Sequence, residues 1–231
     1  MTQKPICIIP ARGGSKRIPR KNIKDFNGKP LIAWSIETAL KSDVFSKVIV
    51  STDDTEIADI SKQYGAEVPF LRIASLADDF ATTAEVLLDA LPKLDQTPYS
   101  CCLYATAPLL EPEDFQRSYE QLKLQKADSI IAVTEFDFHP LRAFIKNSKN
   151  HIEFKSPEYA LTRSQDLPEM FHDAGAFYFF NTSAFISQKK LVMENTIEHK
   201  LERMRALDID TTEDFKLAKL IHQQILKARQ Q

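Results

Sequence analysis

Short apolar runs alternate with longer segments of mixed apolar and polar residues from the N-terminus to about residue 134. Uninterrupted short runs are typical of buried strands, and the longer amphipathic segments are typical of helices. The predicted strands are 6–9, 47–50, 100–104, 129–133 and later 176–180, and the predicted helices are 30–40, 56–64, 83–91, 111–125 and finally 211–228. The pattern predicts an α/β fold with a doubly wound, mostly parallel Rossmann-like sheet.

The alternation fails between about residues 136 and 172, where aromatic residues, prolines and charges are mixed without a period. Two pieces, 142–145 and 151–154, favour an extended hairpin. We therefore predict an arm inserted at 136–172 into a single domain that spans 1–231. Apolar groups exposed on such an arm need a surface to cover them, and a second copy of the chain is the usual solution, so we expect a homodimer.

Composition and charge narrow the class of protein. The 231 residues, 43% of them hydrophobic, are enough for a sizeable core. A net charge of −2 gives no cationic field for nucleic acid. No apolar run approaches the ~20 residues that span a bilayer, and the start does not resemble a signal peptide. We expect a cytoplasmic protein without nucleic-acid or membrane partners, in which Cys7, Cys101 and Cys102 are reduced core residues.

The segment PARGGSKRIPRKN, after the first predicted strand, concentrates positive charge. From Arg12 to Lys29 there are seven basic residues and one acidic residue, Asp25. Gly13 and Gly14 let the backbone approach a ligand, and arginine and lysine form charge-assisted hydrogen bonds with phosphate. The glycine spacing matches neither a Walker loop nor a dinucleotide fingerprint. The segment therefore predicts a triphosphate site, and a solvated basic loop is the alternative.

A second candidate site is the alternating segment Leu207 to Asp210. On an extended backbone, Asp208 and Asp210 project to the same side and can share one ion. Mg²⁺ suits them because it takes few carboxylates together with phosphate oxygens and waters. The alternative is a capping box from Thr211 to Asp214, which would start the last helix without excluding the metal. Another acidic pair, at 53 and 54, fits helix capping better than metal binding.

The stretch IPARGGSKRIPRKN resembles the N-terminal signature of the CMP-sialate synthetase (acylneuraminate cytidylyltransferase) family, and the order of motifs agrees over nearly the whole chain. The resemblance implies a GT-A-like nucleotidyltransferase domain in which Arg12, Lys21, Asp208 and Asp210 are catalytic, and the aspartates bind Mg²⁺. The nucleotide-binding residues that it implies are Ala11, Arg12, Gly13, Gly14, Ser15, Lys16, Lys21, Asn22, Thr82 and Thr83. The two threonines match a position near cytosine, and either could instead cap the following helix.

The resemblance also implies a site for an acidic sugar. Arg163 and Gln165, in LTRSQDLP, match family residues near the sugar, and arginine is a bidentate donor to a carboxylate. A surface or interface salt bridge is the alternative for Arg163. Gly175 would let substrate approach closely. His172 precedes it in an aromatic stretch, where packing is a more common role than catalysis.

The segment CCLYATAPLL occupies the place of Q-P-T-S-P-L-R in sialate-activating relatives, so that Tyr104, Ala105 and Leu110 replace Gln, Pro and Arg. This segment, with ADDFATT and FHDAGAFYF, resembles the branch of the family that activates pseudaminic acid. The terminal methyl of that sugar would match an apolar or aromatic neighbour such as Tyr104.

The expected reaction is attack by the anomeric hydroxyl of pseudaminic acid, a nine-carbon acidic sugar, on the α-phosphorus of CTP, with release of pyrophosphate. Alternatives within this chemistry are N-acetylneuraminic, legionaminic and Kdo acids as acceptors. Two alternatives of other classes are a non-catalytic nucleotide-binding protein and an interaction protein built around the arm.

Overall fold

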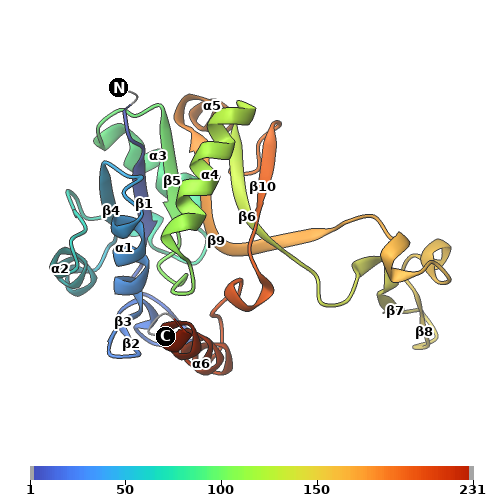
Figure 1. Cartoon of the computed structure of the whole chain (residues 1–231). Helices are drawn as coiled ribbons and strands as arrows, with labels where there is room; N and C mark the ends of the chain where they lie inside the picture. Colours follow the sequence, from blue (N-terminus) through green and yellow to red (C-terminus); the bar gives the residue numbers. More distant parts are fainter. Residues whose placement is uncertain (1–2, 229–231) are drawn as a thin grey trace.

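The structure, a computed structural model, describes residues 3–228 and is built around a six-stranded sheet with helices on both faces (Figure 1). The strand order is β10-β6-β9-β5-β1-β4, and β9 runs antiparallel to both of its neighbours while the other pairs are parallel. The strands are β1 Ile6–Pro10, β4 Lys47–Ser51, β5 Tyr99–Leu103, β6 Ser129–Glu135, β9 Phe171–Asn181 and β10 Thr196–Lys200. The prediction of a doubly wound, mostly parallel sheet is confirmed.

The helices divide between the two faces of the sheet because successive strand residues point in opposite directions. Cys7 and Ile9 of β1 pack in the cluster that includes α1, α2 and α4, whereas Ile6 and Ile8 pack with α3 and α5. The helices are α1 Leu31–Lys41, α2 Thr55–Gln63, α3 Thr83–Ala90, α4 Pro112–Gln125, α5 Thr182–Gln188 and α6 Thr212–Ala228. Short 3-10 helices cover Lys21–Ile23, Ala74–Leu76, Leu91–Lys93, Pro140–Arg142, Pro157–Tyr159, Ser164–Asp166 and Arg203–Arg205.

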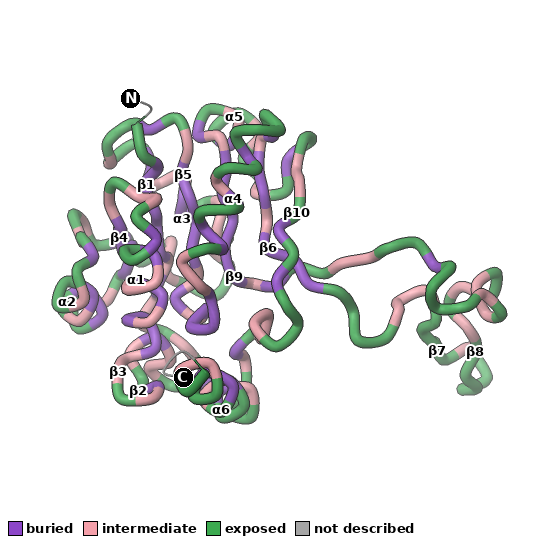
Figure 2. The backbone as a smooth tube through the Cα atoms, in the orientation of Figure 1, coloured by how far each residue is buried: buried purple, intermediate pink, exposed green. Residues whose placement is uncertain are grey.

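The core lies along the strands of the sheet, which are buried for most of their length except at the edge strand β10 (Figure 2). Phe115 of α4 contacts Phe177 and Phe179 of β9, with ring centroids 5.3 and 6.3 Å apart. All three cysteines are free and buried, as the sequence predicted. Within residues 3–228, no helix has the length and apolar character needed to cross a membrane.

A separate small cluster packs α6 against the segment that follows β1. Ile18, Phe26 and Phe215 are buried there together with Ile209. Phe26 lies in β2 Asp25–Phe26, which pairs with β3 Lys29–Pro30. Burial of Ile209 fixes the backbone between the two candidate metal ligands beside the basic loop, and Lys21 Nζ donates to the Ile209 carbonyl over 2.6 Å. Packing and polar contacts together join segments about 190 residues apart.

Sequence reasoning missed α5 and β10 as well as the short strands β2 and β3, and it underestimated one strand. Both α5 and β10 mix polar and apolar residues, as in TIEHK of β10, so neither gives an uninterrupted apolar run. The strand predicted at 176–180 extends back to Phe171 as β9. Its first residues are partly exposed because they pair with β6 but not with β5.

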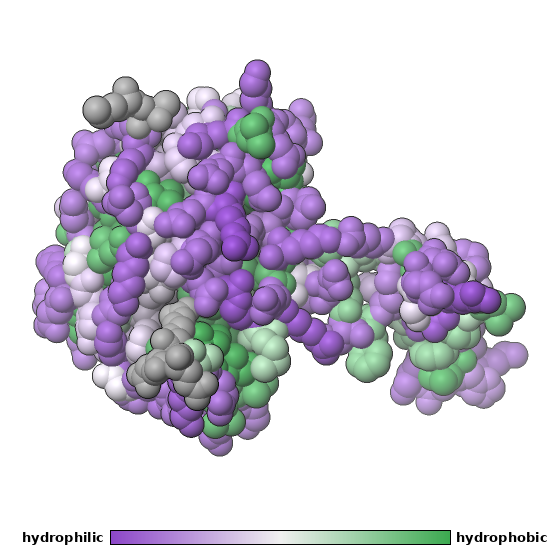
Figure 3. Space-filling model, viewed as in Figure 1, coloured by the Kyte–Doolittle hydropathy of each residue, from purple (hydrophilic) through white to green (hydrophobic). Residues whose placement is uncertain are grey.

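The segment between β6 and β9 projects from the body of the molecule (Figure 1). It contains a hairpin of β7 Phe144–Lys146 and β8 Ile152–Phe154 close to the two predicted pieces. The large apolar side chains exposed on this segment are Phe136, Phe138, Phe144, Ile145, Ile152 and Leu161. Figure 3 shows several apolar side chains grouped on it, away from the main body.

Candidate functional site

The basic loop after β1 is held in place by the end of β4. The Gly13 N–H donates to Asp53 Oδ1 over 3.1 Å. A Cβ atom at Gly13 would lie 2.6 Å from Asp54 Oδ2, so only glycine fits at this approach. Asp54 caps α2 by accepting from the Ile57 N–H, as predicted, but the capping prediction was wrong for Asp53, which binds the loop instead.

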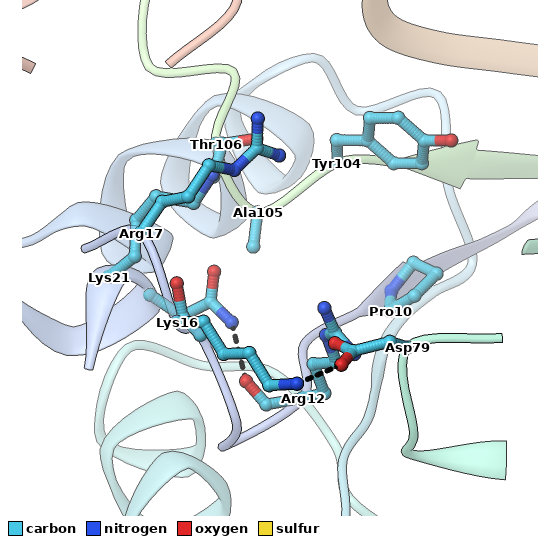
Figure 4. Close-up of a pocket in the computed structure, with 11 residues that line it drawn as sticks. Pro10, Arg12, Lys16, Arg17, Lys21, Asp79, Tyr104, Ala105 and Thr106 are labelled. Atoms are coloured by element: carbon cyan, nitrogen blue, oxygen red, sulfur yellow. Dashed lines mark hydrogen bonds and ion pairs between the residues drawn. The ribbon is translucent and has the colours of Figure 1, made fainter. Parts of the chain in front are cut away.

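The loop also folds back on itself and presents its cations to one cavity. Asn22 Nδ2 donates to the Arg12 carbonyl over 3.0 Å. The cavity has a volume of about 410 Å³ and opens at the carboxyl ends of β1 and β5, where open α/β sheets bind ligands. Its lining residues are Pro10, Arg12, Ser15, Lys16, Arg17, Lys21, Asn22, Asp79, Tyr104, Ala105 and Thr106 (Figure 4).

Carboxylates pair with cations that line this cavity. Asp79 forms ion pairs with Arg12, at 2.8 Å, and with Lys16. The Lys16 and Arg12 hydrogen bonds lower the pKa of Asp79. On the other side of the cavity, Asp210 accepts from Arg17 at 2.8 Å and lies 3.7 Å from Lys21 Nζ. A triphosphate that enters must therefore replace these carboxylates as the partner of each cation.

Asp208 and Asp210 lie just before α6, and Asp210 reaches this cavity through its ion pairs with Arg17 and Lys21. Burial, followed by the charge of Asp210, raises the pKa of Asp208. Burial also lowers the pKa of Lys21, in spite of the nearby carboxylates. These two pKa shifts indicate that water is partly excluded around Asp208 and Lys21 and that charges interact strongly there.

The pair fits a metal ion that needs few protein ligands. The described part of the chain has no group of three or more His, Cys, Asp or Glu residues arranged to hold a metal. Zinc sites normally need three or four such ligands, whereas Mg²⁺ takes one or two carboxylates with phosphate oxygens and waters. The predicted capping box is also present, because the Asp214 carboxylate accepts from the Thr211 N–H and the Asp214 N–H donates to Thr211 Oγ1.

Asp208 borders another cavity, of about 720 Å³, which Phe136 and Phe138 of the projecting segment also line. Gly175 adopts φ +59°, and a Cβ atom there would lie 3.7 Å from Asp208 Cγ. His172 and Asp173 line this cavity together with Asp208. The His172 ring packs against Phe136 with centroids 4.9 Å apart, which agrees with the packing role expected for it.

The two threonines that match the cytosine position have different roles. Thr82 is the N-cap of α3, in a capping box with Glu85. Thr83 is half-buried and lines a cavity of about 250 Å³ that adjoins the cationic cavity. Its Oγ1 is 3.0 Å from Tyr104 Oη. Both cavities share Pro10, Arg12, Asp79 and Tyr104.

The structure does not bring Arg163 and Gln165 to the cationic cavity of their own chain. Both are exposed on the projecting segment, around the 3-10 helix Ser164–Asp166. Neither lines any of the three cavities around Asp208 and Tyr104.

Sequence reasoning missed several residues of the site. Arg17 belongs to the basic loop and Asp79 to the segment ADDFATT, but the sequence assigns a specific role to neither. Arg72 is buried beside the smaller cavity and donates to the Leu76 carbonyl and to Ser51. Burial lowers the pKa of Arg72. No local pattern marks these residues, because their partners are distant in sequence.

The chain is similar to known cytidylyltransferases over nearly its whole length. A family model described as cytidylyltransferase matches residues 6–229. A pseudaminic acid cytidylyltransferase of Campylobacter jejuni is 43% identical over 223 residues, which cover 95% of this chain and 96% of that protein. An N-acylneuraminate cytidylyltransferase of Streptococcus agalactiae is 30% identical over 92% of this chain and 52% of its own length.

Solved structures show the same fold at low identity. A CMP-2-keto-3-deoxy-manno-octonic acid synthetase complexed with CTP superimposes with a TM-score of 0.71 at 18% identity, covering 96% of this chain and 99% of that chain. A 4-diphosphocytidyl-2C-methyl-D-erythritol synthase from Anaerococcus prevotii superimposes with a TM-score of 0.67 at 16% identity, with the same coverage.

Proposed function

The chain belongs to the cytidylyltransferase family, and from that premise we propose that it transfers CMP from CTP to pseudaminic acid and releases pyrophosphate. The observation that carries the proposal is the cavity lined by the cationic loop, in which two of the lining cations, Arg17 and Lys21, pair with Asp210. A triphosphate needs several fixed cations, and the loop supplies Arg12, Lys16 and Lys21 within one cavity. The 43% identity to a pseudaminic acid cytidylyltransferase supports the choice of sugar.

The chain's own residues can position both substrates for in-line displacement. Arg12, Lys16 and Lys21 exchange their carboxylate partners for phosphate oxygens and stabilise the charge that grows on the leaving pyrophosphate. Cytidylyltransferases of this fold typically use a divalent metal. We take it to be Mg²⁺, held by Asp208 and Asp210, where it would supply positive charge and lower the pKa of the attacking hydroxyl.

For the sugar, we assign the surroundings of Gly175, which lies beside Asp208, and of Tyr104, which lines the cationic cavity. The aromatic ring of Tyr104 replaces a hydrogen-bonding glutamine and suits a sugar that ends in a methyl group. N-acetylneuraminic, legionaminic and Kdo acids remain the alternatives, in that order. We place the reaction in the cytoplasm, where CTP is available.

We further propose that the active form is a homodimer joined through the projecting arm, 136–172. The arm exposes Leu161 almost fully and carries Arg163 and Gln165 away from its own cavity. These two polar residues can reach a sugar carboxylate only if the arm lies over the cavity of a second subunit. In a dimer of this kind, the same contact would cover the apolar side chains of the arm and add Arg163 and Gln165 to the partner's site.

Pyrophosphate release by the purified protein with CTP and Mg²⁺ tests the reaction, with pseudaminic and N-acetylneuraminic acids compared in parallel. Faster release with pseudaminic acid is expected. Asp210→Asn should abolish most of the turnover, whereas Glu213→Gln, an exposed acid in the first turn of α6, should not. Near wild-type turnover of Asp210→Asn would show that the metal assignment is wrong.

Subunit complementation tests the dimer. In a mixture of Arg163→Ala and Asp210→Asn proteins, a mixed dimer would pair an intact arm with an intact carboxylate pair at one of its two sites. Activity should therefore rise above that of either variant alone after the subunits are exchanged. No gain in a mixture shown by mass spectrometry to contain mixed dimers would place Arg163 outside the partner's site.

A further inference from the structure

The cationic loop turns sharply at Arg20, the residue before the 3-10 helix Lys21–Ile23. Arg20 has φ +57° and ψ 31°, which lies in the left-handed region. A Cβ atom crowds the backbone in that region, so a residue other than glycine adopts it only where its surroundings hold it there. The surroundings of the Arg20 side chain therefore decide whether this turn persists.

The guanidinium of Arg20 binds two carboxylates at the start of α2. Nη1 and Nη2 donate to the two oxygens of Asp54, the second over 3.2 Å, and Nη2 also donates to Glu56. Asp54 is itself fixed, because its carboxylate caps α2 by accepting from the Ile57 N–H over 3.0 Å. The hydrogen bond between Arg20 and Asp54 raises the pKa of Arg20 and lowers the pKa of Asp54. These charge-assisted bonds form a clamp that ties the turn to the end of a helix.

The turn sets the direction of the next two side chains. Lys21 and Asn22 line the cationic cavity (Figure 4), whereas Arg20 is not among its lining residues. Lys21 Nζ donates to the Ile209 carbonyl over 2.6 Å, and Asn22 Nδ2 donates to the Arg12 carbonyl over 3.0 Å. A right-handed or extended backbone at Arg20 would send the following residues in another direction, and Lys21 would leave the cavity.

We propose that the clamp of Arg20 on Asp54 and Glu56 holds the left-handed turn and thereby aims Lys21 at the triphosphate. Arg20 is a positioning residue, since it acts through Lys21 and does not touch the nucleotide. The inference deepens the proposed function and rests on it, because it requires that the cavity binds CTP. It does not depend on which sugar acid accepts CMP. The competing explanations are a salt bridge that only stabilises the fold and a direct contact of Arg20 with phosphate.

The test measures the affinity for CTP by isothermal titration calorimetry, with Mg²⁺ and without a sugar acid. Arg20→Ala removes the clamp and keeps the Cβ atom, so the backbone should leave the left-handed conformation and the affinity should fall about tenfold. Arg20→Gly also removes the clamp, but glycine adopts positive φ without steric cost. Its affinity should stay within about threefold of wild type. Arg117→Ala, the same change at an exposed position of α4, should leave the affinity unchanged.

A double-mutant cycle identifies the residue through which Arg20 acts. In a Lys21→Ala protein, Arg20→Ala should lower the affinity for CTP no further, because the lysine that it positions is already absent. A direct contact of Arg20 with phosphate would instead give the same loss in both backgrounds. If Lys21→Ala weakens binding beyond detection, the comparison of Arg20→Gly with Arg20→Ala decides. A loss of stability alone would lower the stoichiometry and leave the dissociation constant of the folded fraction unchanged.

Three results would overturn the inference and leave the proposed function intact. These are an unchanged affinity in Arg20→Ala, equal affinities of Arg20→Ala and Arg20→Gly, and the same loss from Arg20→Ala in the wild-type and Lys21→Ala backgrounds. Failure of the wild-type protein to bind CTP would contradict the proposed function, and the inference with it.

Discussion

Replacing Asp114 with asparagine should destabilise the fold through one buried ion pair. Asp114 is 5% exposed, and its carboxylate accepts from both terminal nitrogens of Arg205, at 2.7 and 3.1 Å, and from His199 at 3.4 Å. Arg205 lies three residues before Asp208. The pair therefore ties the first turn of α4 to the segment that carries the candidate metal ligands.

The magnitude follows from the pKa of the carboxyl group. Burial alone would raise the pKa of Asp114, but the hydrogen bonds from His199, Arg205 and the Glu111 N–H outweigh burial and lower it from 3.8 to about 2. At about 1.4 kcal/mol per pKa unit, this is roughly 2.5 kcal/mol in favour of the folded state. Asparagine removes that term and leaves the Arg205 charge buried, so the total loss should be about 3 kcal/mol.

Urea unfolding at pH 7, followed by circular dichroism, measures the loss. Glu113→Gln makes the same change of charge at an exposed position one residue earlier, and should shift the free energy of unfolding by less than about 0.5 kcal/mol. Because the folded-state pKa is depressed, the stabilisation is present above about pH 4 and is lost as the pH falls toward 2. The gap between wild type and Asp114→Asn should narrow over that range. An equal gap at pH 3 and pH 7 would refute the reasoning.

Two further predictions concern the site itself. Asp79→Asn should tighten CTP binding several-fold, as measured by calorimetry, because Arg12 and Lys16 lose a carboxylate that competes with phosphate. Asp95→Asn, which changes an exposed acid elsewhere, should leave the affinity for CTP unchanged. Weaker CTP binding by Asp79→Asn would mean that Asp79 orients the cations instead. Gly175→Ala should slow pyrophosphate release, because it strains a left-handed residue by about 1 kcal/mol and places a methyl beside Asp208. Gly28→Ala is the control, because Gly28 has φ +88° and open space around it, so that alanine there adds strain without a new contact. Equal losses of activity in the two variants would show that the methyl beside Asp208 does not affect the reaction.

The phosphate loop and the carboxylate pair could be predicted because each is a local pattern. Gly13 and the basic residues follow one strand directly, and Asp208 and Asp210 alternate on one extended segment. The fold class was predictable for the same reason, since the first strands are continuous apolar runs. In each case the physical signal lies within about twenty residues.

The remaining parts of the site depend on contacts that no local pattern records. Asp79 pairs with Arg12 across 67 residues, and Tyr178 meets Tyr104 across two neighbouring strands. The sequence also could not give the direction of the arm. Because the arm projects from the body, Arg163 lies away from the cavity of its own chain. We therefore propose that Arg163 binds substrate in the site of a second subunit.

The position of β9 has a consequence for how the chain is made. This strand lies between β5 and β6, and joins the half of the sheet formed by β1, β4 and β5 to the half formed by β6 and β10. Until residue 181 has left the ribosome, β5 and β6 each present an unpaired edge with apolar faces. Such edges pair readily with other chains. Nascent chains that end before β9 should therefore aggregate or recruit chaperones, and folding of the sheet should be complete only late in synthesis.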